Sequence, residues 1–171
     1  MIELITGGAR SGKSSYALSQ AEAVEGNHIY IATATAEDRS MERRIRRHQE
    51  ERDNCWALIE EPLAVSQIMS DYGKGDVVLI DCLTLLLSNW LCSHQASKWV
   101  AEKENLLQAL ADTEASVFIV TNEVGMGVVP MGALSRDFVD ESGWLHQAVA
   151  GISDKVTLVM FGIPSVIKAS D

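Results

Sequence analysis

The stretch GGARSGKS at residues 7–14 decides the fold of this chain. It fits the pattern G-x-x-x-x-G-K-[ST], a loop that cradles the phosphates of a nucleoside triphosphate. An apolar run at residues 2–6 precedes it and a segment with helical potential, residues 13–24, follows it. This order of strand, glycine loop and helix is the context that the motif requires. The predicted nucleotide-binding residues of the loop are Gly7, Gly8, Ala9, Arg10, Ser11, Gly12, Lys13 and Ser14.

The residue types in this loop suit phosphate binding. Gly7 and Gly12 allow backbone conformations that are closed to residues with a Cβ, so several N–H groups can point at one phosphate chain. The start of the next helix adds unpaired donors and the positive end of its dipole. We expect Lys13 to contact the β- and γ-phosphates and the Ser14 hydroxyl to bind Mg²⁺.

Composition restricts the class of protein. The chain has 171 residues, 47% of them hydrophobic, which favours one packed domain over residues 1–171. Its net charge of −10 argues against a nucleic-acid or anionic-membrane surface. An odd number of cysteines without C-x-x-C spacing fits a reducing compartment. No signal peptide and no membrane-spanning run is evident, so we expect no membrane insertion and a cytoplasmic location.

Short apolar runs alternate with helical segments along the chain. This alternation predicts an α/β fold of the P-loop NTPase type, with a predominantly parallel sheet and helices on both faces. Ligands bind outside the carboxyl ends of strands in such sheets. The predicted strands are residues 2–6, 28–33, 56–60, 77–81, 116–121 and 156–161. The predicted helices are residues 13–24, 41–52, 63–72, 83–90, 98–112 and 143–152.

The apolar run at residues 77–80 ends in Asp81, as in a Walker B strand. A carboxylate at the end of that strand would lie near Ser14 and hold Mg²⁺ directly or through water. The alternative is an acidic residue that caps the next helix.

Positive charge is concentrated in one segment of this acidic chain, since residues 39–52 hold six of its 14 lysines and arginines. If the segment is helical, Arg44, His48 and Arg52 share one face. Neighbouring cations keep His48 neutral, the form with a nucleophilic lone pair, and arginines bind phosphate oxygens. The face is suited to hold a triphosphate while His48 attacks phosphorus. The alternative is a solvated helix whose charges pair along its surface.

Several segments together resemble the bifunctional adenosylcobinamide kinase/adenosylcobinamide-phosphate guanylyltransferase family of cobalamin synthesis. They extend over nearly the whole chain in family order, and the pattern RI-x-x-H-x-x-x-R and the segment TNEVGMGVVP are the most specific of them. These segments are residues 6–14, 30–34, 44–52, 81–84, 120–130, 136–143 and 162–164.

The resemblance implies two reactions. One phosphorylates adenosylcobinamide with a nucleoside triphosphate, ATP or GTP. The other transfers GMP from GTP to adenosylcobinamide phosphate through a GMP-histidine intermediate, a role that the motif places on His48. Gln49, Glu50 and Glu51 then join Arg44 and Arg52 in the predicted nucleotide-binding set. A homotrimer also follows from the resemblance, and Mg²⁺ is the cofactor expected from Ser14 and Asp81.

Further residues at the expected ligand edge complete the prediction. Thr33, Ala34 and Thr35 follow the second strand and are predicted to contact the nucleotide, with a hydroxyl-rich turn as the alternative. Glu60 could bind the guanine edge or the ribose, or it could form an acid pair at a helix start. The glycine-bearing loop at residues 122–127 could admit a corrinoid.

One departure from the family pattern and two rival functions remain open. His146 stands where the family has Asn, and no role is assigned to it. A simple P-loop kinase would leave His48 without a function and form no covalent intermediate. A nucleotide-dependent switch would bind nucleotide tightly and turn over slowly.

Overall fold

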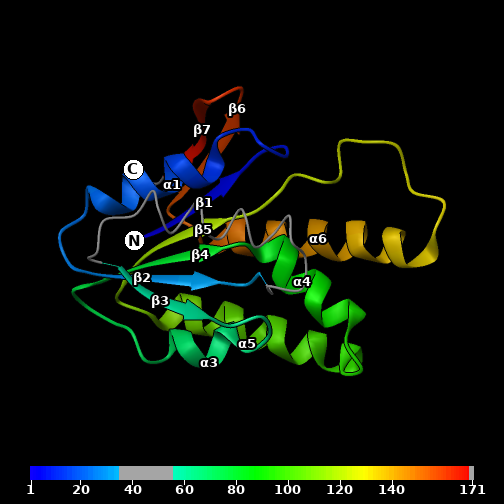
Figure 1. Cartoon of the computed structure of the whole chain (residues 1–171), viewed down its shortest axis with the longest axis horizontal. Coiled ribbons are helices and arrows are strands. Elements are labelled where there is room, and N and C mark those ends of the chain that lie inside the picture. The colour runs from blue at the N-terminus through cyan, green and yellow to red at the C-terminus, as the bar shows by residue number, and fades with distance from the viewer. Residues whose placement is uncertain (35–55, 170–171) are drawn as a thin grey trace.

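The computed structural model describes residues 1–34 and 56–169. These residues form an α/β structure around a seven-stranded sheet of order β3-β2-β4-β5-β1-β6-β7, shown in Figure 1. The first six strands along the chain pair in parallel, and β7 pairs antiparallel with β6. The strands are β1 (Ile2–Thr6), β2 (Asn27–Ala32), β3 (Trp56–Glu60), β4 (Asp76–Asp81), β5 (Ser116–Val120), β6 (Lys155–Met160) and β7 (Ile163–Ala169).

Helices lie on both faces of this sheet, and α1 and α5 lie on opposite sides of it in Figure 1. They are α1 (Lys13–Glu22), α3 (Val65–Met69), α4 (Leu83–Cys92), α5 (Trp99–Asp112) and α6 (Ala133–Ile152), with a short 3₁₀ turn, η1 (Ala96–Lys98). No described helix is long and apolar enough to cross a membrane.

The strands are apolar on both faces, which is why two cores form. In β4, Val78 and Ile80 pack with α3, α4, α5 and α6, whereas Val77 and Leu79 pack on the α1 side. Because successive side chains of a strand point to opposite faces, one continuous apolar run supplies both cores. The predicted parallel sheet covered by helices is therefore confirmed.

The antiparallel strand β7 was not predicted. It follows a tight turn in which Phe161 and Gly162 both have positive φ, 55° and 79°. Two central residues of positive φ match the right-handed twist of a hairpin, but the usual sequence is Asn-Gly or Asp-Gly. A phenylalanine at the first position gives no such signal, and Pro164 further weakens the strand pattern.

Helix α6 begins ten residues before its predicted start at Gly143. Its first turns, residues 133–137, are exposed, so they lack the apolar periodicity on which a sequence-based prediction depends. Gly143 lies inside the helix, where a Cβ would meet no atom within 4 Å. The predicted helix at residues 41–52 lies outside the described residues.

Candidate functional site

The loop at residues 7–12 joins β1 to α1, and its backbone requires glycine at two positions. Gly7 has φ 152° and Gly12 has φ 98°, values that residues with a side chain rarely adopt. A Cβ at Gly7 would lie 2.2 Å from the carbonyl oxygen of Val159 in β6. A larger residue would therefore force the loop away from the sheet.

Backbone hydrogen bonds hold the loop between two neighbouring segments. The Gly162 amide, in the β6–β7 turn, donates to the Ser11 carbonyl at 2.9 Å, and the Glu123 amide, after β5, donates to the Gly7 carbonyl at 3.0 Å. The Ser11 Oγ is buried and has no hydrogen-bond partner among the described residues. Buried hydroxyls are rarely left unpaired, so the loop as it stands leaves one of its own polar groups unsatisfied by the described residues.

The start of α1 is open to an anion. Its N-cap is Gly12, which has no side chain to bond the first amides, and its first turn contains no acidic residue. The unpaired N–H groups and the positive end of the helix dipole therefore act together. Ser14, the second residue of the helix, is half-buried at this end.

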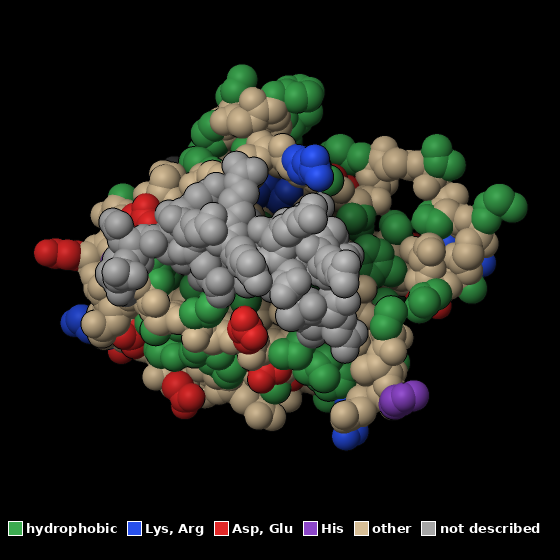
Figure 2. Space-filling view, in the orientation of Figure 1, with side chains coloured by type: hydrophobic (Ala, Val, Ile, Leu, Met, Phe, Trp, Pro, Cys, Tyr) green, Lys and Arg blue, Asp and Glu red, His purple; other side chains and the backbone are tan. Residues whose placement is uncertain are grey.

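Lys13 is folded back onto the loop. Its Nζ donates to the Gly8 carbonyl at 2.6 Å, and the residue is only 6% exposed. Burial lowers the pKa of Lys13, and the negative charge of Asp81 opposes that shift in part. Figure 2 shows lysine and arginine side chains in a hollow below the β6–β7 hairpin.

Asp81 ends β4, separated from β1 by β5. Its Oδ2 accepts a hydrogen bond from the Tyr30 hydroxyl at 2.9 Å. Its charge also acts on Lys13, so the carboxylate and the loop lie within electrostatic range of one another. The thiol of the next residue, Cys82, is buried, and burial, followed by the charge of Asp81, raises its pKa to about 11. Cys82 therefore stays protonated at neutral pH and is a poor nucleophile.

The other predicted contacts are distributed around the same edge. Thr33 is fully buried. Its hydroxyl donates to the Cys82 carbonyl and accepts from the Cys82 amide. Ala34 is half-buried, and Glu60 is exposed at the end of β3. Glu61 accepts the amides of Leu63 and Ala64 at 2.8 Å each, so Glu61 holds the turn that precedes α3.

The remaining predicted site residues lie outside the described part of the chain. They are Thr35, Arg44, His48, Gln49, Glu50, Glu51 and Arg52.

Two polar residues near the site were not given a role by sequence reasoning. Tyr30 donates to Asp81, and the signal for it was a tyrosine between two isoleucines, Ile29 and Ile31. The His146 Nε2 lies 2.7 Å from the Thr121 Oγ1. Burial lowers the pKa of His146, partly opposed by the charge of Glu123, so a neutral imidazole fits this position. The interaction is internal to the fold, between α6 and the residue after β5.

The chain is similar to proteins that are named for cobalamin biosynthesis. A family model described as cobinamide kinase / cobinamide phosphate guanyltransferase matches residues 3–167. The bifunctional adenosylcobalamin biosynthesis protein CobP of Pseudomonas aeruginosa is 45% identical over 170 residues, with 98% of each chain covered. The bifunctional adenosylcobalamin biosynthesis protein CobU of Escherichia coli is 36% identical over 185 residues, with 98% of this chain and 100% of that protein covered.

Solved structures support the fold at low sequence identity. The type III secretion ATPase EscN of enteropathogenic E. coli gives a TM-score of 0.59 at 13% identity, over 99% of this chain and 47% of that one. A KaiC-like protein from Pyrococcus horikoshii gives 0.51 at 16% identity, over 92% and 69%. The predicted P-loop NTPase type of fold is thereby confirmed.

Proposed function

This chain belongs to the cobinamide kinase / cobinamide phosphate guanyltransferase family, and we propose that GMP is carried between its two substrates on His48. The protein is a bifunctional kinase and guanylyltransferase of cobalamin biosynthesis. In the proposal, it phosphorylates adenosylcobinamide with ATP or GTP, and it then joins GMP from GTP to adenosylcobinamide phosphate. The products of the second reaction are adenosylcobinamide-GDP and pyrophosphate.

The observation that supports nucleotide binding is the loop at residues 7–14 at the carboxyl edge of the sheet, and the covalent step rests on the sequence pattern around His48. The glycine-dependent backbone of the loop, the open N-terminus of α1 and the ammonium of Lys13 are three independent anion-binding features in one place. On nucleotide binding we expect Lys13 to exchange the Gly8 carbonyl for phosphate oxygens. That exchange relieves the cost of a buried, poorly solvated charge.

The same edge fits Mg²⁺. Among residues 1–34 and 56–169 there is no cluster of three or more His, Cys, Asp or Glu side chains that could hold a metal by themselves. Mg²⁺ does not need such a cage, because it commonly binds through one or two protein oxygens, substrate phosphates and water. Ser14 and Asp81 would supply the protein oxygens, and the ion would neutralise charge that develops on the phosphates.

The proposed guanylyl transfer balances in two displacements. A nitrogen of neutral His48 attacks the α-phosphorus of GTP, a P–N bond forms, and the bond to the leaving pyrophosphate breaks. An oxygen of adenosylcobinamide phosphate then attacks the same phosphorus, and the imidazole is released. Arg44 and Arg52 would stabilise charge on the equatorial oxygens. Because the transfer is divided into two steps, one nucleotide site can pass GMP first to the histidine and then to adenosylcobinamide phosphate.

We further propose a cytoplasmic homotrimer. Two exposed apolar segments support association: the β5–α6 connection, with Val128 at 96% and Met131 at 97% exposed, and the β6–β7 hairpin, with Phe161 at 90%. Figure 2 shows green side chains gathered on both projections. Exposed apolar side chains gathered in this way commonly mark a protein interface.

The test uses purified protein, Mg²⁺ and GTP labelled on the α- or the γ-phosphate. We expect acid-labile α-label on the denatured wild-type chain and none on His48→Ala, with γ-label absent from both. Nucleotide binding measured in parallel shows whether the variant still binds GTP. If GTP binds to the wild-type protein and no α-label is retained, the covalent mechanism is wrong and a simple kinase or a switch becomes the better description.

A further inference from the structure

We propose that the end of β2 is the positioning element for Asp81: Tyr30 orients its side chain and Thr33 fixes its backbone, leaving one carboxylate oxygen for the metal. This inference rests on the proposed function, in which Asp81 serves Mg²⁺. It gives a physical role to the segment at residues 30–34, one of the segments that carried the family resemblance.

The side-chain part of the argument is the bond from Tyr30 to Asp81. β2 and β4 are parallel neighbours in which Tyr30 pairs with Leu79 and Ala32 pairs with Asp81. The tyrosine ring therefore extends along the sheet by two residues to bring its hydroxyl 2.9 Å from Asp81 Oδ2. Tyr30 is itself buried on the α1 side, with the Trp56 ring at its edge, so the position of its hydroxyl is well determined.

The backbone part of the argument comes from Thr33. Its amide donates to the Asp81 carbonyl at 3.0 Å. Its hydroxyl accepts the Cys82 amide at 2.7 Å and donates to the Cys82 carbonyl at 2.8 Å. Three bonds thus hold the backbone on the carboxyl side of Asp81, where β4 ends and pairing with the sheet would otherwise stop.

The carbonyl of Thr33 is fixed in turn. Asn89, on α4, donates through Nδ2 to the Thr33 carbonyl at 2.8 Å and to the Pro62 carbonyl at 3.0 Å. The support of Asp81 is therefore continuous from β2 into α4. A rigid support matters because a group that binds a metal or a phosphate must be held within a few tenths of an ångström of its working position.

Chemically, the arrangement divides the two oxygens of one carboxylate. Oδ2 accepts the hydroxyl of Tyr30, so Oδ1 is the oxygen left for Mg²⁺ or for a water bound to it. Outer partners of this kind orient ligating carboxylates, and their removal typically lowers metal affinity 10- to 100-fold. Tyr30 and Thr33 are thus positioning residues that act through Asp81.

The test measures how much Mg²⁺ strengthens nucleotide binding. The probe is a GTP analogue with a methylene bridge between the α- and β-phosphorus atoms, which cannot transfer GMP, titrated by calorimetry with Mg²⁺ or with EDTA. The Mg²⁺ ratio is the dissociation constant measured in EDTA divided by the one measured in Mg²⁺, so a high ratio means that Mg²⁺ strengthens binding. It is compared for wild type, Asp81→Asn, Tyr30→Phe and the double variant. We expect Tyr30→Phe to lower the ratio about tenfold and to have no further effect in the Asp81→Asn background.

Tyr16→Phe is the matched control. It also removes a tyrosine hydroxyl that bonds a carboxylate, Glu3, at 3.4 Å, but this carboxylate is buried in the sheet away from the metal position. We expect the Mg²⁺ ratio of this variant to equal that of wild type. Thr33→Ser and Thr33→Val form a second pair, since the first keeps the hydroxyl and should keep the ratio, whereas the second should lower it.

The outcomes separate this inference from the proposed function. If Asp81→Asn leaves the ratio unchanged, Asp81 does not serve the metal, and the metal assignment and this inference fail together. If Asp81→Asn lowers the ratio but Tyr30→Phe does not, only the positioning role of Tyr30 is overturned. An equal loss from Tyr30→Phe with and without Asp81 would also overturn it, because the tyrosine would then act elsewhere.

Discussion

Glu3 and Asp81 are two carboxylates on parallel strands of the same sheet, and each accepts a hydrogen bond from a tyrosine. Tyr16 donates to Glu3 at 3.4 Å, and Tyr30 donates to Asp81 at 2.9 Å. Beyond this shared contact, their surroundings differ in every respect that decides function.

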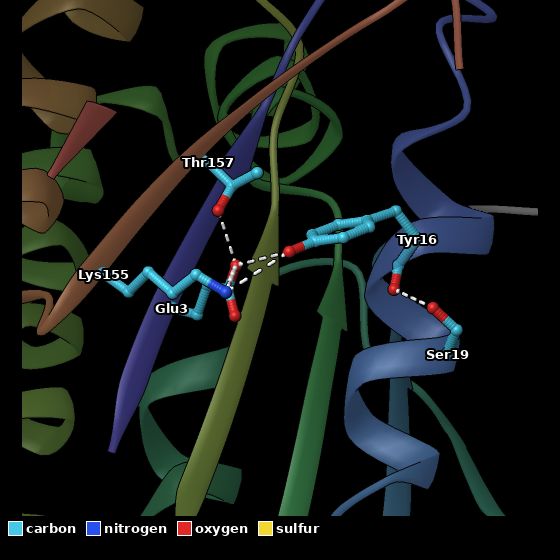
Figure 3. Close-up of polar contacts among 5 residues, drawn as sticks. All are labelled: Glu3, Tyr16, Ser19, Lys155 and Thr157. Atoms are coloured by element: carbon cyan, nitrogen blue, oxygen red, sulfur yellow. Dashed lines mark hydrogen bonds and ion pairs between the residues drawn. The ribbon is translucent and has the colours of Figure 1, made fainter. Parts of the chain in front are cut away.

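Glu3 is enclosed by partners on two elements, α1 and β6. It is 1% exposed, and its Oε1 accepts the Thr157 hydroxyl at 2.7 Å and lies 3.1 Å from the Lys155 Nζ, as Figure 3 shows. Burial alone lowers the pKa of Lys155, but its hydrogen bonds to Glu3 and Tyr16 outweigh burial and raise it. The cluster fixes β1, α1 and β6 to one another.

Asp81, by contrast, is half-buried and lies within electrostatic range of Lys13. The difference follows from position along the strand, since Glu3 is the second residue of β1 and Asp81 is the last residue of β4. Ligands of parallel sheets bind beyond the carboxyl ends of the strands. The same side-chain chemistry is therefore structural near the start of a strand and available for catalysis at its end.

The largest expected effect is a contrast between two matched substitutions: Asp81→Asn should lower turnover and Glu3→Gln should lower stability. Asp81→Asn should lower guanylyltransferase and kinase turnover about 100-fold or more, because a metal ligand supplies several kcal/mol of charge stabilisation, while the melting temperature changes little. Glu3→Gln should lower stability by about 1 kcal/mol through lost charge-assisted hydrogen bonds, while turnover per folded molecule is kept. Thermal unfolding and initial rates on the same preparations measure both.

The contrast also shows how the comparison could fail. If Glu3→Gln reduced turnover as strongly as Asp81→Asn in fully folded protein, the enclosed carboxylate would contribute to catalysis. If Asp81→Asn chiefly lowered the melting temperature, the bond from Tyr30 would be a structural link like the one from Tyr16.

The next effect concerns the cation beside Glu3. Lys155→Met leaves the buried carboxylate of Glu3 without its positive partner. An unpaired buried charge destabilises a fold more than the loss of a surface lysine does. We expect a loss of about 2 kcal/mol at neutral pH, below the 3–5 kcal/mol of fully buried pairs because Lys155 is partly solvated. Urea unfolding at neutral pH measures the loss.

Lys103→Met is the control for this prediction. Lys103 pairs with Glu141 at 3.0 Å, but both side chains are about one fifth exposed, so removal of Lys103 should cost less stability. Equal losses from the two lysine variants would mean that the depth of the carboxylate does not decide the cost.

Much of this architecture could be predicted from the sequence, because the physical signals were local. Apolar runs of strand length located β1 to β6, and a glycine pattern located the loop. Two elements depended on features without such a signal: β7 follows a turn with Phe161 in a left-handed conformation, and the first turns of α6 are exposed. Periodicity reports burial, so exposed helix and atypical turns are beyond its reach.

The candidate site shows the same division. Lys13 and Asp81 could be predicted because each stands at a fixed place in a strand-loop pattern. The support of Asp81 could not, because Tyr30 and Thr33 reach it across a strand pairing between β2 and β4 that only the sheet order reveals. The role of His48 stays a prediction, as do the roles of all the other predicted site residues, Lys13 and Asp81 included.

The smallest expected effect comes from a third carboxylate, which tests whether a cation is what makes a buried acid stabilising. Glu102 in α5 is 7% exposed and accepts the amide and the hydroxyl of Ser66 at 3.1 and 2.8 Å. No lysine or arginine among the described residues forms an ion pair with it. Burial raises its pKa above the ordinary 4.5, and its hydrogen bonds to Ser66 oppose that shift only in part.

Because the folded-state pKa of Glu102 is raised, the fold binds this proton more tightly than the unfolded chain does. Its contribution to stability is therefore greatest in acid and declines as pH rises from about 4.5 through the raised pKa.

The substitution Glu102→Gln tests this pH dependence. The glutamine can still accept a hydrogen bond from the Ser66 amide and can donate one to the Ser66 hydroxyl, and it has no charge to desolvate. We expect this variant to be more stable than wild type at pH 8, by less than about 1 kcal/mol, and to lose that part of the pH dependence. Urea unfolding between pH 4.5 and 8 measures the effect, with exposed Glu104→Gln on the same helix as the control. A variant less stable than wild type at pH 8 would show that the two bonds from Ser66 stabilise the carboxylate without any cation, and Lys155 would then not be what distinguishes Glu3.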